Sequence, residues 1–90
     1  MMDPYMKKAD ELVRQGKAVL ESRAARMLAA APSHSVSARR RKLMNWKTRY
    51  AEMDRRFDLL RGADTANTSD LKVALEKAID AFRAEIGWTA

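Results

Sequence analysis

The sequence predicts an all-α protein, either a three-helix bundle or a long helical hairpin with a shorter third helix. Dimerisation could complete its core. Large apolar residues recur every three or four positions through most of the 90 residues, which is the period of an amphipathic helix. Proline, glycine and small polar residues interrupt this pattern twice, and no segment alternates apolar and polar residues as a strand would. We therefore expect residues 1–90 to form a single helical domain.

The first helix is predicted over residues 4–31. Asp3 is a favourable N-cap residue, and Pro4 then occupies the first helical position, where its missing N–H is not needed. Pro32 disfavours helical conformation in the residue before it, so the helix should end near Ala31. Gly16 costs ~1 kcal/mol relative to alanine inside a helix, and it indicates a close helix crossing or a kink. The apolar face carries Tyr5, Ala9, Leu12, Val13, Val19, Leu20, Ala24, Met27, Leu28 and Ala31.

The second helix is predicted over residues 37–61, after a serine cap at Ser35 or Ser37. Its apolar residues are spaced alternately by three and four, and this heptad seam is typical of a helix that packs against another helix. The seam could begin one heptad earlier at Val36, and Gly62 is expected to end the helix in the left-handed conformation. The sequence leaves open whether the seam packs within one chain or between two. Its residues are Leu43, Trp46, Tyr50, Met53, Phe57 and Leu60.

The third helix is predicted over residues 69–86, with Thr68 or Ser69 as its cap and Asp70 placing negative charge at its positive end. Gly87 followed by Trp88 is typical of a Schellman ending, in which the residue after the glycine folds back on the last turn. This helix is the shortest of the three, so one end of the hairpin formed by the other two should stay uncovered. Its apolar face carries Leu71, Leu75, Ala78, Ile79, Phe82 and Ile86.

The predicted core is small for a chain of this length. Leu, Ile, Val and Phe together make sixteen of the 90 residues. A domain of this size buries only about 60 to 65 % of the surface that its unfolded chain exposes. From this shortage and from the aromatic seam we expect a homodimer or larger homo-oligomer. The uncovered end of the hairpin is one place where a second copy could pack.

Enzymatic chemistry is not indicated by any motif in the sequence. The chain has no cysteine, and its one histidine, His34, lies between two serines in a predicted loop. There is no glycine-rich phosphate loop, nucleophile motif or paired-histidine spacing, so we expect no enzyme activity, no cofactor and no metal site. The lack of cysteine and of any long apolar run favours a soluble, cytoplasmic protein.

The net charge of +6 is concentrated in the middle third of the chain. Residues 33–62 carry nine basic and three acidic side chains, whereas residues 63–90 carry three basic and five acidic ones. Four consecutive cations in the opening turn of the second helix oppose the helix dipole, and a site that breaks a local rule is a candidate for function. The candidate partner-binding residues are Arg39, Arg40, Arg41, Lys42, Lys47, Arg49, Arg55, Arg56 and Trp88.

Two interpretations of the basic stretch remain open. Its side chains could bind phosphate or carboxylate groups of a partner. Alternatively, Asp70, Glu76, Asp80 and Glu85 of the third helix could lie against the second helix and neutralise part of its charge. Trp88 likewise either packs under the Schellman turn or serves as an exposed anchor for a partner, since tryptophan is enriched in binding hot spots.

We expect a non-enzymatic, small basic helical protein that acts by binding a macromolecule, with an acidic protein as the first hypothesis. Its size suits an accessory or inhibitory module of the kind that phages and other mobile elements encode. A nucleic-acid-binding regulator that uses the basic second helix is the second hypothesis. A structural subunit of a larger assembly is the third. Acidic residues within both long helices argue against binding to a membrane surface.

Overall fold

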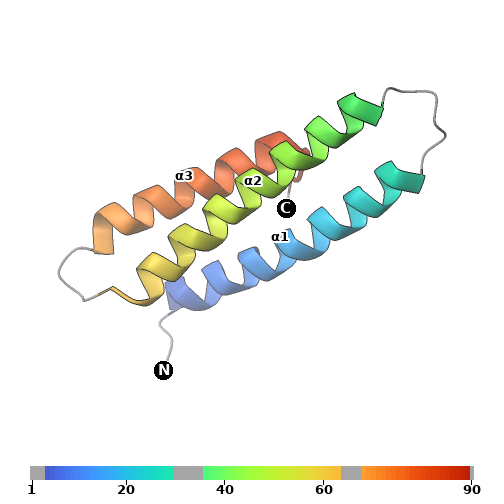
Figure 1. The fold of residues 1–90 in the computed structure, drawn as a ribbon. Helices are drawn as coiled ribbons and strands as arrows, with labels where there is room; N and C mark the ends of the chain where they lie inside the picture. The colour runs from blue at the N-terminus through green and yellow to red at the C-terminus, as the bar shows by residue number, and fades with distance from the viewer. Residues whose placement is uncertain (1–3, 30–35, 64–67, 90) are drawn as a thin grey trace.

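A computed structural model of the protein describes residues 4–29, 36–63 and 68–89 (Figure 1). Three helices make up nearly all of them: α1 (Pro4–Ala29), α2 (Val36–Arg61) and α3 (Thr68–Ile86). Consecutive helices run antiparallel to one another and form an elongated three-helix bundle of 52 × 19 × 19 Å (Figure 1). The predicted all-α class and the three helices are confirmed, and each boundary lies within two residues of its prediction.

Some of the predicted helix caps lie outside the described residues. These are Asp3 before α1, Ala31 and Pro32 after it, and Ser35 before α2, together with the loop residue His34. Because α2 already begins at Val36, Ser37 lies inside the helix and does not cap it.

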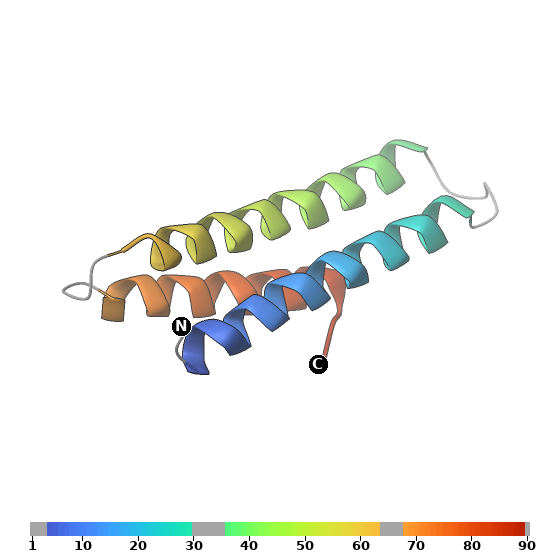
Figure 2. The same cartoon turned by 90° about the horizontal axis from the view of Figure 1, so that it is seen from below.

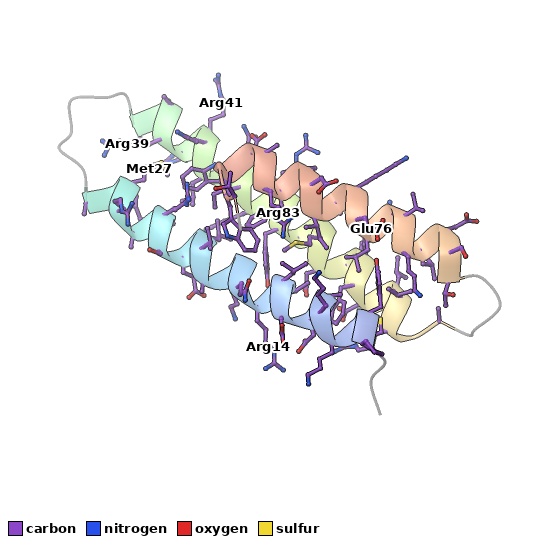
Figure 3. All side chains as sticks on the ribbon, turned by 180° about the vertical axis from the view of Figure 1, so that it is seen from behind. Arg14, Met27, Arg39, Arg41, Glu76 and Arg83 are labelled. Carbon is purple, nitrogen blue, oxygen red and sulfur yellow. The ribbon has the colours of Figure 1, made fainter. Side chains whose placement is uncertain are left out.

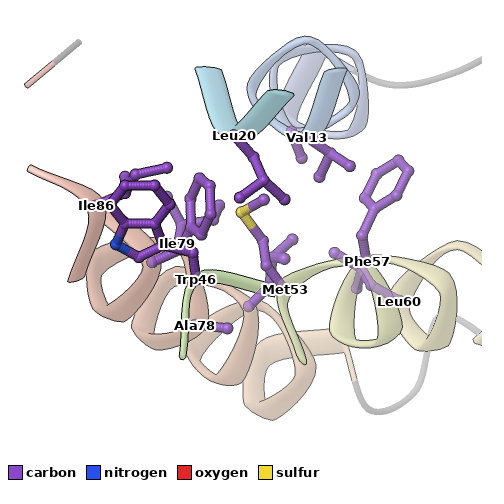
Figure 4. Packing of buried hydrophobic residues seen from close by; sticks show 12 residues of the cluster. Val13, Leu20, Trp46, Met53, Phe57, Leu60, Ala78, Ile79 and Ile86 are labelled. Atoms are coloured by element: carbon purple, nitrogen blue, oxygen red, sulfur yellow. The ribbon is translucent and has the colours of Figure 1, made fainter. Parts of the chain in front are cut away.

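The heptad seam of α2 is buried within the single chain (Figure 4). Met53 is 0 % exposed, and the seam packs against the apolar faces of both other helices. The seam therefore packs within one chain, and self-association of the protein stays a prediction. The buried core consists of Ala9, Val13 and Leu20 of α1, Trp46, Met53, Phe57 and Leu60 of α2, and Leu75, Ala78, Ile79, Phe82 and Ile86 of α3.

The three helices lie close together around Gly16. A methyl group added at Gly16 would lie 3.0 Å from Met53 Cε, 3.2 Å from Phe82 Cε2 and 3.6 Å from Trp88 Cζ3. The first two distances are shorter than ordinary van der Waals contact, so a side chain at Gly16 would have to displace buried neighbours. The predicted close helix crossing is confirmed.

The chain ends in the predicted Schellman turn. Gly87 has a φ of 71°, and the Trp88 N–H donates to the Arg83 carbonyl at 2.9 Å. This turn folds the half-buried Trp88 ring back onto the bundle, edge to face with Phe82 at 6.1 Å between ring centroids. The Arg83 guanidinium lies over the Trp88 ring, 5.2 Å from the ring centroid. Trp88 therefore packs on the last turn of α3 with its ring only half-buried, and its use as an anchor for a partner stays a prediction.

The predicted left-handed ending of α2 at Gly62 is wrong. Within the described residues Gly87 is the glycine with positive φ. The φ of Gly62 is not positive, so residues other than glycine can adopt its conformation. Its N–H continues the α pattern to the Asp58 carbonyl at 3.1 Å, and the Ala63 N–H then bonds the Leu60 carbonyl at 3.2 Å. A tighter last turn of this kind satisfies the final carbonyl groups without a left-handed residue.

Tyr5 connects the first turn of α1 to the first half of α3 by hydrogen bonds. Its hydroxyl donates to the Glu76 carboxylate at 3.2 Å and lies 3.4 Å from the Lys72 carbonyl oxygen. The Lys72 ammonium lies 4.7 Å from the centre of the Tyr5 ring. Burial, together with the negative charge of Glu76 and the hydrogen bond to it, raises the pKa of Tyr5 to about 12.

A basic end of the bundle as candidate binding site

One end of the α1–α2 hairpin is not covered by α3 (Figures 1 and 2). The last turn of α3 is held beside Trp46, whose indole N–H donates to the Glu85 carbonyl at 3.2 Å, and beside Arg23, which donates to the Ile86 carbonyl at 2.7 Å. The ten residues of α2 before Trp46, ~15 Å of helix, therefore extend past α3. The predicted uncovered end is confirmed. We call residues 23–29, 36–46 and 84–87 the basic end.

The uncovered end explains why one predicted core residue is exposed. Leu28 was placed on the apolar face of α1, but its exposed fraction is 65 % because α3 stops before it reaches this level. Met44, on the facing helix, is 66 % exposed. These two are the most exposed large apolar side chains in the described part of the chain, and both lie at the basic end.

An open pocket of about 490 Å³ lies where the three helices meet at the basic end. Its volume falls in the range of ordinary ligand sites. Five apolar residues, three cations and one carboxylate line it. The lining residues of this end pocket are Met27, Trp46, Ala84, Ile86 and Gly87, with Arg23, Arg26, Lys42 and Glu85.

Arg23, Arg26 and Lys42 of the basic end form no salt bridge with another described residue. Between described residues the salt bridges are Arg14–Asp10, Arg56–Glu52 and Arg61–Asp58, and each lies within one helix away from this end. The Lys42 ammonium instead lies over the Trp46 ring, 5.6 Å from its centre, and the Arg23 guanidinium caps the last carbonyl of α3. Neither Lys42 nor Arg23 is therefore paired with a carboxylate in the described part of the chain.

The four consecutive cations of α2 do not form one face. Arg39 is half-buried and lies on the side of α2 that faces α1, near Met27, whereas Arg41 points away from the bundle (Figure 3). Arg40 and Lys42 are exposed, and Lys42 reaches the end pocket. The side chains fan out because consecutive residues of an α-helix are about 100° apart around its axis.

The other predicted binding residues lie farther along α2. Arg49 and Arg56 line a groove between α2 and α3, where the Arg56 Nε also donates to Glu52 at 2.8 Å. Lys47 and Arg55 are exposed but line neither this groove nor the end pocket. The structure thus divides the predicted basic surface of α2 into several faces.

The acidic residues of α3 do not neutralise α2. Glu76 and Asp80 line a hollow between α3 and α1, together with Lys8 of α1, and Glu76 accepts the hydrogen bond from Tyr5. Glu85 lines the end pocket beside Lys42, and no salt bridge between described residues joins α2 to α3.

Three cations of these surfaces were missed by the sequence reasoning: Arg23 and Arg26 of α1 and Lys77 of α3. Arg26 lies in the last turn of α1, where a basic residue complements the helix dipole, and Arg23 and Lys77 are single cations inside their helices. The available signal was the short connection between the first two helices, which brings the last turn of α1 beside the first turn of α2.

Comparisons with protein-family models, with curated proteins and with solved structures found no match to this chain. In the part of the chain that the structure describes, no three His, Asp or Glu side chains come together as metal ligands would. None of the three described helices combines the length and apolarity needed to cross a bilayer. The function is therefore inferred from the residues of the basic end.

Proposed function

We propose that this protein is a non-enzymatic binding module whose basic end receives an acidic segment of a partner protein. The observation that carries the proposal is the end pocket, where Arg23, Arg26 and Lys42 surround a wall formed by Met27 and Trp46. Such a site is complementary to an apolar side chain flanked by carboxylates. A single exposed ion pair contributes only ~0.2 to 1 kcal/mol, so several carboxylates must act together with the apolar contact.

An acidic protein is favoured over nucleic acid because the aromatic rings are not available for base stacking. Phe57 is 3 % exposed and Trp88 is packed on the last turn of α3, and Trp46, which is 6 % exposed, offers too little surface at the end pocket for a base to stack on. The exposed Leu28 and Met44 add apolar surface, which suits a protein partner better than phosphate groups do. By this binding the protein would block an acidic surface of a larger machine, which is an accessory or inhibitory role. The cysteine-free sequence suits the cytoplasm.

A second copy of the chain is a poor occupant of the basic end. Arg26, Arg40, Arg41 and Lys42 of one copy would face the same cations of the other, and like charges brought together destabilise an interface. An unlike, acidic partner removes this repulsion. Sedimentation of the 10.2 kDa chain at low and high salt measures whether self-association occurs and whether it needs charge screening.

The proposal is tested with a short fluorescent peptide of glutamates around one central leucine. We compare Arg26→Glu/Lys42→Glu at the rim of the end pocket with Lys47→Glu/Arg55→Glu, a control pair on other faces of α2. Both double variants take the formal net charge from +6 to +2. The rim variant should bind about tenfold more weakly, a loss of ~1.4 kcal/mol, whereas the control pair should retain most of the affinity.

Replacing the central leucine of the peptide by glutamine should also weaken binding, because the apolar wall of the pocket then has no partner. Circular dichroism checks that both double variants are folded. Equal losses in the rim and control variants would show that only net charge matters. Tighter binding to duplex DNA than to the peptide, with affinity falling steeply as salt rises, would replace the proposal by the nucleic-acid hypothesis.

A further inference from the structure

We propose that the groove between α2 and α3 docks an acidic amphipathic helix of the partner protein, which lies along the bundle as a fourth helix. This inference rests on the proposed function, because it assumes the same acidic partner. It adds a second surface, and it assigns a conformation to the segment that binds there.

The floor of the groove is made of alanines. Ala74, Ala78 and Ala81 follow one another on α3 at spacings of four and three residues, so they share one face of the helix. The groove has a volume of about 330 Å³. Small side chains on its floor allow a helix to approach to the short end of the usual 8 to 10 Å between packed helix axes.

The walls of the groove are basic on both sides. Arg49 and Arg56 rise from α2 and Lys77 from α3, and Glu52, which is paired with Arg56, is the one acidic residue among those that line it. Neither Arg49 nor Lys77 takes part in a salt bridge between described residues. This charge is complementary to carboxylates on the flanks of an incoming helix.

The spacing of the cations points to a helical occupant. Arg49 and Arg56 are seven residues apart, and Lys42 of the end pocket stands seven residues before Arg49. The three side chains therefore form a row along one side of α2 that is ~21 Å long. A partner helix with carboxylates every seven residues presents a matching row, and its end would lie beside the end pocket.

The test uses a synthetic helical peptide of about twenty residues, ~30 Å long, with glutamates at seven-residue spacing beside an alanine and leucine face. A control peptide has the same composition, with the glutamates distributed around the helix. Affinities are measured by isothermal titration calorimetry for the wild type, for Arg49→Glu/Lys77→Glu and for the matched control Lys47→Glu/Arg55→Glu. We expect about tenfold weaker binding in the groove variant, and less than twofold in the control.

Ala81→Leu tests the shape of the groove without changing its charge. Ala81 is half-buried at the groove, so a leucine there fills the floor and should weaken peptide binding, whereas Ala51→Leu on the exposed side of α2 should not. Circular dichroism and thermal melts establish that both variants fold.

The inference is overturned if Arg49→Glu/Lys77→Glu and Ala81→Leu bind the peptide as the wild type does, or if the two peptides bind equally well. If Arg26→Glu/Lys42→Glu weakens binding while the groove variants do not, the groove is not used but the proposed function stands. If none of these variants weakens binding, both proposals fall. Displacement of the peptide by an equal concentration of duplex DNA would overturn the assignment to a protein helix.

Discussion

Replacing Gly16 by alanine should destabilise the protein by about 1 kcal/mol, although alanine is the better helix former. In an open helix the substitution would stabilise by ~1 kcal/mol. At Gly16 the added methyl group meets Met53 at 3.0 Å and Phe82 at 3.2 Å, and both of these side chains are 0 % exposed. Both side chains belong to the buried core, and overpacking of a core costs ~1 to 3 kcal/mol. The steric cost should therefore exceed the gain in helix propensity.

The other two glycines are matched controls for the same substitution. A methyl group at Gly62 would meet only the Asp58 carbonyl oxygen at 3.6 Å, an ordinary contact, and the φ of Gly62 is not positive. Gly62→Ala should therefore be neutral or stabilise by up to ~1 kcal/mol. Gly87 has a φ of 71°, where a side chain costs ~1 to 2 kcal/mol, so Gly87→Ala should destabilise.

Urea denaturation followed by far-ultraviolet circular dichroism gives the free energy of unfolding for each of the three variants. Unchanged slopes with denaturant would show that the variants unfold in the same way as the wild type. If Gly16→Ala were as stable as Gly62→Ala, α1 would not approach α2 and α3 closely at Gly16, and the described packing would be incorrect there.

Three further predictions concern other parts of the molecule. Burial first, and then the charge of Glu76 and the hydrogen bond to it, raise the pKa of Tyr5 from 10 to about 12, so its stabilising contribution is present below pH 10 and is lost as the pH rises toward 12. The difference in unfolding free energy between wild type and Tyr5→Phe should shrink over that range, and a constant difference would contradict the raised pKa of Tyr5. Arg40→Glu/Arg41→Glu should raise the melting temperature, because acidic groups at a helix start stabilise by ~0.3 to 1 kcal/mol each. No salt bridge between described residues holds these two arginines. A lower melting temperature would show that the arginines stabilise the fold. Phe57→Ala should cost ~3 to 5 kcal/mol in unfolding free energy, since Phe57 is 3 % exposed, and a loss near zero would contradict its burial.

The fold was predictable because, along most of the chain, the residues that the helical spacing places on one face are the residues that the core buries. The alternating spacing from Leu43 to Leu60 sets one face of α2, and the structure buries that face. Gly16 could be recognised as a close crossing because glycine inside a helix has a cost that only packing offsets. Leu28 was misplaced because periodicity gives the direction of a side chain around a helix, but not the level at which a neighbouring helix stops.

The candidate site was predictable only in part, because it depends on which helices are neighbours. The sequence indicates the cations of α2, but it does not say that α3 presents Lys77 to α2 and turns Glu76 toward α1. That choice depends on the side of the α1–α2 hairpin on which α3 packs, and heptad spacing alone does not specify it. Arg23 and Arg26 could not be predicted for the same reason, because they line the end pocket only where the end of α3 packs beside them.

The indole N–H of Trp46 offers the most direct test of the basic end as a binding site. It donates to the Glu85 carbonyl in the wall of the end pocket, so its nuclear magnetic resonance signal reports on occupancy of that pocket. Titration with the leucine-containing acidic peptide should shift this signal in the wild type and in Lys47→Glu/Arg55→Glu, and leave it almost unchanged in Arg26→Glu/Lys42→Glu. A signal that does not move while the peptide binds, or that moves equally in all three proteins, would contradict the proposed site.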